Sequence, residues 1–310
     1  MTRTVSPTDP ANRRDPAPPG RPSRRDLLRA GAGGVALGVA RFAPERAAAQ
    51  TAVGSPVSCV LAPEMTEGPY YLPLDLVRQD LTEGKPGLPL RLRIAVMNTQ
   101  GGGCAPLAGA AVDLWHCDAQ GVYSGISGEN PGGGGAATGA DNQSTTFLRG
   151  IQLTGADGVA AFDTIYPGWY QGRAVHIHMK VHVGGDATGA TPPADGYDGG
   201  HVAHTGQLFF DDALSDQVFG TAAYANRDNA ERTRNGQDGI LGDHGDEPGV
   251  MLVLTPVTPG ALADGFDGTV IVGVDAGATP GPASFGGGQG GPSPGGPTAP
   301  LAAPGSPPAP

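Results

Sequence analysis

The sequence is short of positive charge. Its 310 residues include 19 lysines and arginines against 30 aspartates and glutamates, which gives a formal net charge of -11. A surface with this balance repels phosphate polymers and anionic lipid headgroups, so neither nucleic acid nor an acidic membrane surface is an expected partner. Long apolar runs are also absent, and no stretch is apolar enough to span a bilayer as a helix.

Cysteine is scarce as well. The chain has only Cys59, Cys104 and Cys117, and no two of them have C-x-x-C spacing. The absence of this spacing argues against a metal site made of thiolates. Outside the cytoplasm the three residues allow one disulfide and one remaining thiol, and the sequence does not decide which two residues pair.

Glycine and proline are abundant instead, with 53 and 31 residues, and they are unevenly distributed. The stretch 276–310 consists almost entirely of Gly, Pro, Ala and Ser. It has too little apolar surface to offset the entropy lost on ordering, so we predict a disordered tail. The folded domain is expected to occupy residues 57–275.

The first residues have the features of a targeting segment. Ser23–Leu28 (SRRDLL) resembles a twin-arginine export motif, a weakly apolar run follows at 28–40, and Ala47–Ala49 supplies small residues for cleavage. Residues 1–50 are therefore predicted to be a twin-arginine export signal with a disordered lead. The expected localisation is extracellular or in the cell envelope.

Short alternating segments dominate the rest of the chain. Leu90, Leu92 and Ile94 alternate with Arg91 and Arg93, which predicts a half-buried strand over 88–98. Similar patterns predict further strands at 110–116, 147–153, 159–164, 175–183, 207–210, 249–257 and 268–274, and a helix at 212–224 capped by Asp211 or Asp212.

The connections between these elements complete the predicted fold. The segments 147–153 and 159–164 are expected to form a hairpin around a tight turn. The glycine-rich stretches 125–141 and 184–206 are expected to be long loops. Many short strands with Gly and Pro turns and one short helix predict an all-β protein, an immunoglobulin- or transthyretin-like β-sandwich with long Gly-rich loops.

The strongest chemical signal lies in residues 165–179, IYPGWYQGRAVHIHM. Residues two apart on a strand face the same side, so His176 and His178 form a candidate pair of metal ligands. The Pro167-Gly168 turn just upstream can direct a phenol to the same face. Taken alone, a His-x-His pair is often just a partly exposed strand, and a tyrosine can be a core residue with a hydrated hydroxyl.

A second stretch, Leu114–Tyr123 (LWHCDAQGVY), strengthens the metal interpretation because it supplies another phenol. Two phenolates with two imidazoles suit Fe(III), whose high charge lowers the pKa of a phenol enough to ionise it. Zinc and copper sites more often recruit cysteine, aspartate or a third histidine.

The motifs together resemble those of a known family. They are Thr66–Tyr71 (TEGPYY), Trp115–Tyr123, and Tyr166–Tyr170 followed by Arg173 and His176-Ile177-His178. With them the chain resembles, over residues 59–274, the intradiol ring-cleavage dioxygenases, non-haem Fe(III) enzymes that split catechols between the hydroxyl-bearing carbons. It is most similar to the secreted, single-domain members, because it lacks the long helical N-terminal dimerisation segment of the cytoplasmic catechol dioxygenases.

This resemblance implies a cofactor, substrates and site residues. The cofactor is Fe(III), the substrates are an aromatic diol and O2, and the products are cis,cis-muconate-type acids. The implied roles are Tyr123 and His176 as equatorial metal ligands, His178 as an axial ligand, Tyr170 as an axial ligand that substrate displaces and that then acts as a base, Arg173 as a cation over the bound ring, and Gln207 as a pocket residue. Only Gln171-Gly172 separates Tyr170 from Arg173, a shorter connection than in the cytoplasmic members. This difference reshapes the rim of the pocket, so the choice among catechol, protocatechuate and hydroxyquinol stays open.

Two other interpretations stay open at this point. The chain could be a non-catalytic β-sandwich binding module with a relic metal site, or an exported copper or zinc protein that uses His176, His178 and His182. The remaining candidates are predicted to be structural or solvated: Tyr166 in the core, His116 in a strand beside Trp115, His182 at a pocket wall or surface, and His201, His204 and His244 in polar loops. A homo-oligomer is compatible with the sequence.

Overall fold

The computed structural model describes residues 60–126, 142–188, 196–225, 231–281 and 283. The predicted export signal, Cys59, most of the predicted tail and most of the loop 125–141 lie outside these residues. Among the helices in the described ranges, none is long and apolar enough to cross a membrane.

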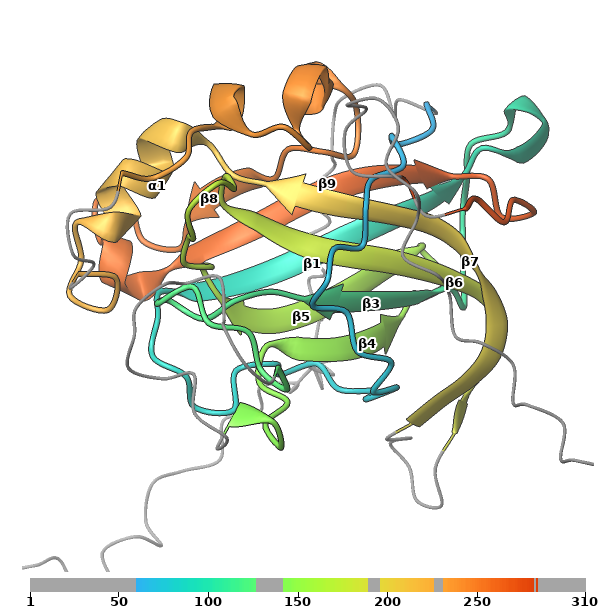
Figure 1. The fold of residues 1–310 in the computed structure, drawn as a ribbon. Helices are drawn as coiled ribbons and strands as arrows, with labels where there is room; N and C mark the ends of the chain where they lie inside the picture. The colour runs from blue at the N-terminus through green and yellow to red at the C-terminus, as the bar shows by residue number, and fades with distance from the viewer. Residues whose placement is uncertain (1–59, 127–141, 189–195, 226–230, 282, 284–310) are drawn as a thin grey trace, which may run out of the picture. The chain divides into compact units, whose positions relative to one another are not determined.

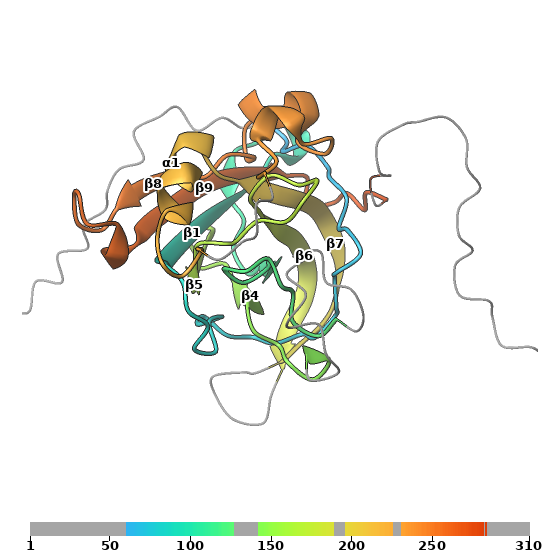
Figure 2. The same cartoon turned by 60° about the vertical axis from the view of Figure 1, so that its left-hand side comes forward.

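Two β-sheets pack face to face (Figures 1 and 2). The first contains β1 (Pro89–Asn98), β2 (Ala105–Pro106), β5 (Val159–Ile165), β8 (Val253–Pro256) and β9 (Phe266–Val274). The second has the order β4-β3-β6-β7 and contains β3 (Ala111–Trp115), β4 (Arg149–Leu153), β6 (His176–Thr188) and β7 (Gly196–Phe209). All its pairs are antiparallel, whereas β1 and β9 run parallel. The predicted all-β sandwich is confirmed.

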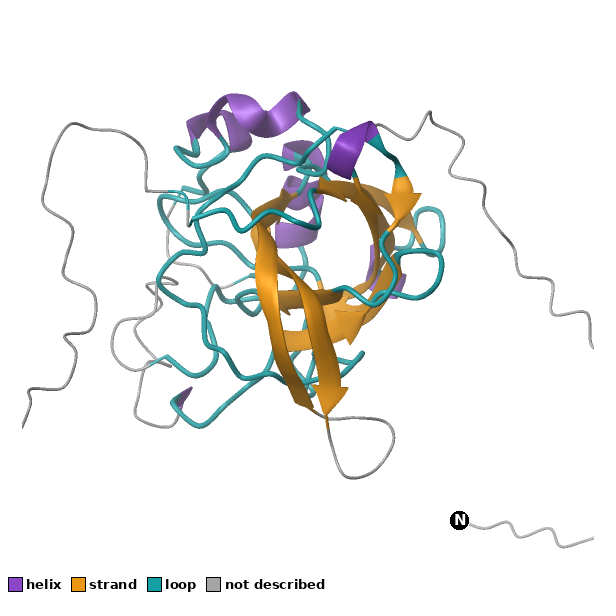
Figure 3. Cartoon of the chain, turned by 90° about the vertical axis from the view of Figure 1, so that its right-hand side faces the viewer, coloured by secondary structure: helices purple, strands orange, loops and turns teal. Residues whose placement is uncertain are grey.

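The one α-helix in the described ranges, α1 (Asp212–Phe219), begins where the capping signal predicts. Asp211 is the N-cap, and its carboxylate accepts a hydrogen bond from Leu214 N. The helix ends at Phe219, with Gly220 as its C-cap, earlier than predicted. Short 3-10 helices lie at Gln100–Gly102, Asn235–Gln237, Gly242–Asp246 and Leu262–Asp264. Figure 3 shows most of the helical segments gathered on one side of the strands.

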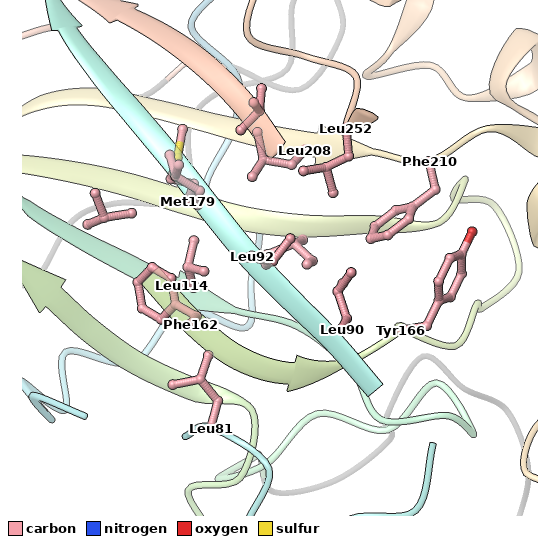
Figure 4. Packing of buried hydrophobic residues seen from close by; sticks show 14 of the residues in the cluster. Leu81, Leu90, Leu92, Leu114, Phe162, Tyr166, Met179, Leu208, Phe210 and Leu252 are labelled. Carbon is pink, nitrogen blue, oxygen red and sulfur yellow. The ribbon is translucent and has the colours of Figure 1, made fainter. Parts of the chain in front are cut away.

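The hydrophobic core lies between the two sheets. Leu90 and Leu92 on β1 point inward and face Leu114 and Met179 of the opposite sheet (Figure 4). Both leucines are almost fully buried. Burial of a side chain of this size contributes about 1.5–3 kcal/mol relative to leaving it exposed, so this alternation holds the sheets together.

The outer face of the second sheet carries a set of polar side chains. They are buried because the segment 61–81 crosses this face, with Met65 N bonded to Thr205 O at 2.8 Å and Arg78 N to Ile151 O at 3.0 Å. The buried polar residues of this face include Asp113, Arg149, His176, His178, Lys180 and Gln207. A face that would be wet in a bare sandwich is thereby shielded from water.

The predicted hairpin between β4 and β5 was wrong. β4 pairs with β3 in one sheet and β5 pairs with β1 in the other, so the turn at 155–158 carries the chain between sheets. Gly158 N bonds to Gly155 O at 2.9 Å, so the tight turn itself is present. A turn signal indicates that the chain reverses, but strands distant in sequence decide the pairing.

The predicted loop 184–206 was also wrong, because β6 and β7 run through most of it as a long hairpin (Figure 1). Gly185 pairs with Gly199, and the Tyr197 hydroxyl packs over Gly185, where a Cβ would lie only 2.3 Å from it. Glycine serves close approach here, and backbone hydrogen bonds rather than an apolar pattern define the strands.

Candidate metal centre

β6 places His176 and His178 side by side on the covered outer face. Only 2% and 1% of their surfaces are exposed. His176 Nδ1 lies 2.7 Å from Ala174 O, so this nitrogen carries the proton and Nε2 presents its lone pair. The two Nε2 atoms are 3.0 Å apart. The i, i+2 spacing thus directs both ring nitrogens to one spot, as predicted.

Tyr170 reaches the same spot from the turn that precedes β6. Its hydroxyl lies 3.1 Å from His176 Nε2. Gly168 makes this approach feasible, since a Cβ there would lie 2.5 Å from Asp118 O and 2.6 Å from Ala119 O. Gly168 N also bonds to Asp118 O at 3.0 Å. The turn that carries Tyr170 therefore packs directly on the turn that leads to Tyr123.

Tyr123 completes the group of four predicted ligands. The Asp118 carboxylate accepts hydrogen bonds from Gln120 N at 2.9 Å and Val122 N at 3.1 Å, which shapes the turn before it. The Tyr123 side chain is fully buried, and its hydroxyl lies 3.5 Å from that of Tyr170. Two phenol oxygens and two imidazole nitrogens from separate segments therefore converge.

Burial controls the charge of these four groups. It raises the pKa of Tyr123 and of Tyr170 above the usual value, lowers the pKa of His176 to about 3, and lowers that of His178 well below its usual range. The nearby Arg173 guanidinium lowers the pKa of both imidazoles further. At neutral pH the imidazoles are neutral, and the phenols ionise only when a strong positive charge offsets the loss of water.

Arg173 and Gln207, the other predicted site residues, are in contact. Arg173 Nη2 donates to Gln207 Oε1, and Gln207 Nε2 donates to Thr66 O at 2.8 Å. The Thr66–Tyr71 motif thereby orients the glutamine. The oriented glutamine in turn holds one side of the Arg173 guanidinium.

Asp238 holds the other side of the guanidinium, and sequence reasoning did not find it. Its Oδ2 accepts from Arg173 Nε at 2.9 Å and from Ala174 N at 2.6 Å, and its side chain has no exposed surface. Burial would raise the pKa of Asp238, but Arg173 and backbone N–H groups lower it overall, so the carboxylate is charged. In the sequence, Asp238-Gly239 looks like an ordinary turn, and no local signal marks it.

The remaining histidines lie outside the group of four. His116 is structural as predicted, with its ring nitrogens 2.8 Å from Cys117 O and from Thr164 Oγ1. His182 contacts the Tyr197 ring, and the described ranges hold no group of three His, Cys, Asp or Glu side chains placed to bind a metal. A three-histidine site with His176, His178 and His182 is therefore not formed.

The prediction that His204 is solvated was wrong. Its side chain is 2% exposed, and Nδ1 is bonded to Glu64 Oε1. The carboxylate belongs to the covering segment, which the sequence does not place over β7. His244, by contrast, is exposed and lies 2.7 Å from Glu247. His201 is partly buried, with Nε2 3.2 Å from Ala276 O, so it is only partly solvated.

Tyr166 and two cysteines are also located. Tyr166 lies in the core, with its hydroxyl 2.7 Å from Ser215 Oγ, as predicted. Cys104 is disulfide-bonded. Cys117 is buried, and its sulfur lies 3.6 Å from Gly168 O.

Comparison with known proteins shows what the chain is similar to. Residues 66–185 match a family model described as dioxygenase. The chain is 30% identical over 142 residues to the chlorocatechol 1,2-dioxygenase of Pseudomonas sp. (strain P51), which covers 39% of this chain and 50% of that protein. The solved intradiol ring-cleavage dioxygenase from Tetranychus urticae is similar with a TM-score of 0.56 and 26% identity, covering 72% of this chain and 98% of that one. Over these regions the chain is similar to intradiol ring-cleavage dioxygenases. It spans half the length of the curated relative.

The donor set of this site fits a ferric ion. The four donors converge at hydrogen-bonding distances, two of them become anionic only beside a strong cation, and both phenols are hard oxygen ligands. The segment matched by the family model contains all four, together with Arg173. Gln207 and Asp238 lie beyond it and join the site through the fold.

Proposed function

We propose that this protein is an intradiol dioxygenase that binds Fe(III) through Tyr123, Tyr170, His176 and His178. We propose further that it cleaves catechol-type diols with O2 between the hydroxyl-bearing carbons, giving cis,cis-muconate-type products. The observation that supports this most is the convergence of two buried phenols and two buried imidazoles at 3.0–3.5 Å. Two imidazole nitrogens directed at each other have no role in a purely structural core.

Bound Fe(III) would supply the Lewis acidity and electron transfer that ring cleavage requires. The protein's own part begins with Tyr170, which is 7% exposed while Tyr123 is fully buried. Tyr170 is thus the phenol that an incoming diol can reach. As a tyrosinate, its oxygen would take a proton from a diol hydroxyl.

Arg173 would stabilise the negative charge that develops on the diol. Its guanidinium is oriented on one side by Gln207 and on the other by Asp238, so it needs no reorganisation during the reaction. The covering segment 61–81 keeps water away from the outer face of the sheet. In such a shielded site, a fixed cation acts more strongly than it would in water.

Iron binding tests the first part of the proposal. Protein loaded with Fe(III) should show a visible tyrosinate-to-iron charge-transfer band, and Tyr123→Phe and Tyr170→Phe should weaken or remove it. Tyr166→Phe is the matched control, because Tyr166 is a buried tyrosine of the same stretch whose hydroxyl contacts Ser215. A colourless protein, or tight binding of zinc or copper in preference to iron, would contradict the proposal.

Oxygen uptake tests the second part. Catechol, chlorocatechol, protocatechuate and hydroxyquinol should be compared, with ultraviolet detection of muconate-type products. The chlorocatechol is included because a relative acts on it. At least one diol should give stoichiometric O2 uptake and product. An iron-loaded, coloured protein that consumes O2 with none of them would instead support a non-catalytic binding module.

We also propose export by the twin-arginine route, on the basis of Arg24-Arg25 and the segment that follows. A double substitution to lysine should retain the protein inside a host cell that has this export system. The unchanged sequence should reach the envelope or the medium. Equal distribution of the two proteins would refute the proposal.

A further inference from the structure

His178 is held differently from His176. His176 Nδ1 donates to Ala174 O. His178 Nδ1 is buried and has no hydrogen-bond partner among the described residues. Histidines that bind metals usually donate their second ring N–H to a partner that fixes the ring plane. Another contact has to set the orientation of the His178 ring.

Trp115 makes that contact. It pairs with His178 across the β3–β6 ladder, and the two rings lie parallel, with centroids 4.9 Å apart and an interplanar angle of 5°. Trp115 is 1% exposed, and within the described ranges its indole N–H has no hydrogen-bond partner. Buried tryptophans usually satisfy this N–H, so the ring face rather than the polar group explains its position.

The Thr66–Tyr71 motif holds the tryptophan. The Tyr71 ring lies 4.8 Å from the Trp115 ring, and its hydroxyl is hydrogen-bonded to the Asp113 carboxylate. Lys180 Nζ lies 3.4 Å from the centre of the Tyr71 ring and is paired at 2.6 Å with Glu67. Lys180, Tyr71, Trp115 and His178 thus form a column from a cation to the proposed metal ligand.

We infer that Trp115 is a positioning residue for His178, and that Tyr71 keeps Trp115 in place. Ring stacking takes over the task that a hydrogen bond performs for His176. The inference rests on the proposed function, because it requires a metal at His178. The TEGPYY motif then supports the proposed metal centre in two ways. Thr66 orients Gln207, and Tyr71 holds Trp115.

The test measures metal binding rather than turnover. Trp115→Leu removes the stacked ring, whereas Trp115→Phe keeps an aromatic ring. The affinity of each variant for Fe(III) and for redox-inert Ga(III) is measured by competition with a chelator. Loss of an outer partner of a metal ligand typically lowers affinity about 10- to 100-fold. We expect a loss of about tenfold for Trp115→Leu and less than about threefold for Trp115→Phe, with a shifted charge-transfer band in the first variant only.

Phe162→Leu is the control for general destabilisation. Phe162 is equally buried, at 1%, but lies in the core between the sheets. It should lower the unfolding midpoint of the metal-free protein without changing metal affinity. If Trp115→Leu does not fold, Tyr71→Leu replaces it, with an expected loss of about threefold or more because the tryptophan loses its support.

The outcomes separate the two proposals. If the unchanged protein binds Fe(III) and Ga(III) and the folded leucine variants bind them equally well with the same band, the positioning role is refuted while the proposed function stands. If the unchanged protein binds neither ion, the proposed function fails and the inference fails with it.

Discussion

Replacing Asp238 by asparagine keeps the size of a fully buried side chain but removes its charge. In the wild type, Oδ2 accepts from Arg173 Nε and Ala174 N, and Oδ1 accepts from Ile240 N at 2.8 Å and Leu241 N at 2.9 Å. Asparagine has only one acceptor oxygen. One pair of these donors would therefore face an NH2 group.

The expected cost follows from burial. The Arg173 side chain is only 11% exposed, so its guanidinium cannot regain full hydration when its partner loses the charge. Removing one member of a buried ion pair costs about 3–5 kcal/mol. Because Arg173 keeps its bond to Gln207, we expect the lower end, about 3 kcal/mol in the free energy of unfolding.

Urea unfolding of the metal-free protein measures this loss. Asp267→Asn is the matched control, because Asp267 pairs with Arg91 at 2.6 Å while both side chains are about half exposed. That variant should lose less than about 1 kcal/mol. If the two variants lose the same amount, the buried pair does not organise Arg173. With iron bound, kcat/KM for the diol should fall in the Asp238 variant alone.

Two further predictions concern pH and packing. Burial lowers the pKa of His116 to about 4, so the folded state loses stability as the pH falls from about 6.5, where the unfolded chain takes up the proton, towards 4. The full loss in the free energy of unfolding is about 3 kcal/mol. His116→Gln should therefore flatten this part of the pH profile of the urea midpoint. An unchanged profile would contradict the role of buried, neutral His116. Gly168→Ala should cost about 1–3 kcal/mol and weaken iron binding, because its Cβ would push the Tyr170 turn away from Asp118 O. Gly236→Ala, where a Cβ meets nothing within 4 Å, should do neither, and equal effects of the two alanines would refute the argument.

The sequence predicts the strands better than their partners. The alternation around Leu92 and Ile94 identifies β1, because one face of a strand has to be apolar to enter the core. The 155–158 turn was recognised, yet nothing local shows that β4 and β5 join different sheets. The β6–β7 hairpin was missed where glycine replaces the side-chain pattern.

The residues of the candidate site are likewise predictable from the sequence only in part. The four donors lie in two short stretches whose residue types limit the chemistry, and the fold brings them together. The pairs Arg173–Asp238 and His204–Glu64 join residues 65 and 140 positions apart, which no local pattern reveals. Trp115 stands in a recognised motif, but its task follows only from its parallel contact with the His178 ring.

The parallel pairing of β1 and β9 has a consequence for how the protein is made. β9 lies between β1 and β8, and 176 positions separate the paired Arg91 and Asp267. During translation, β1 leaves the ribosome long before this neighbour exists, and one of its edges stays unpaired until residue 274 has been added. Contacts this distant in sequence slow folding, so we expect the nascent chain to need a chaperone until the sandwich can close.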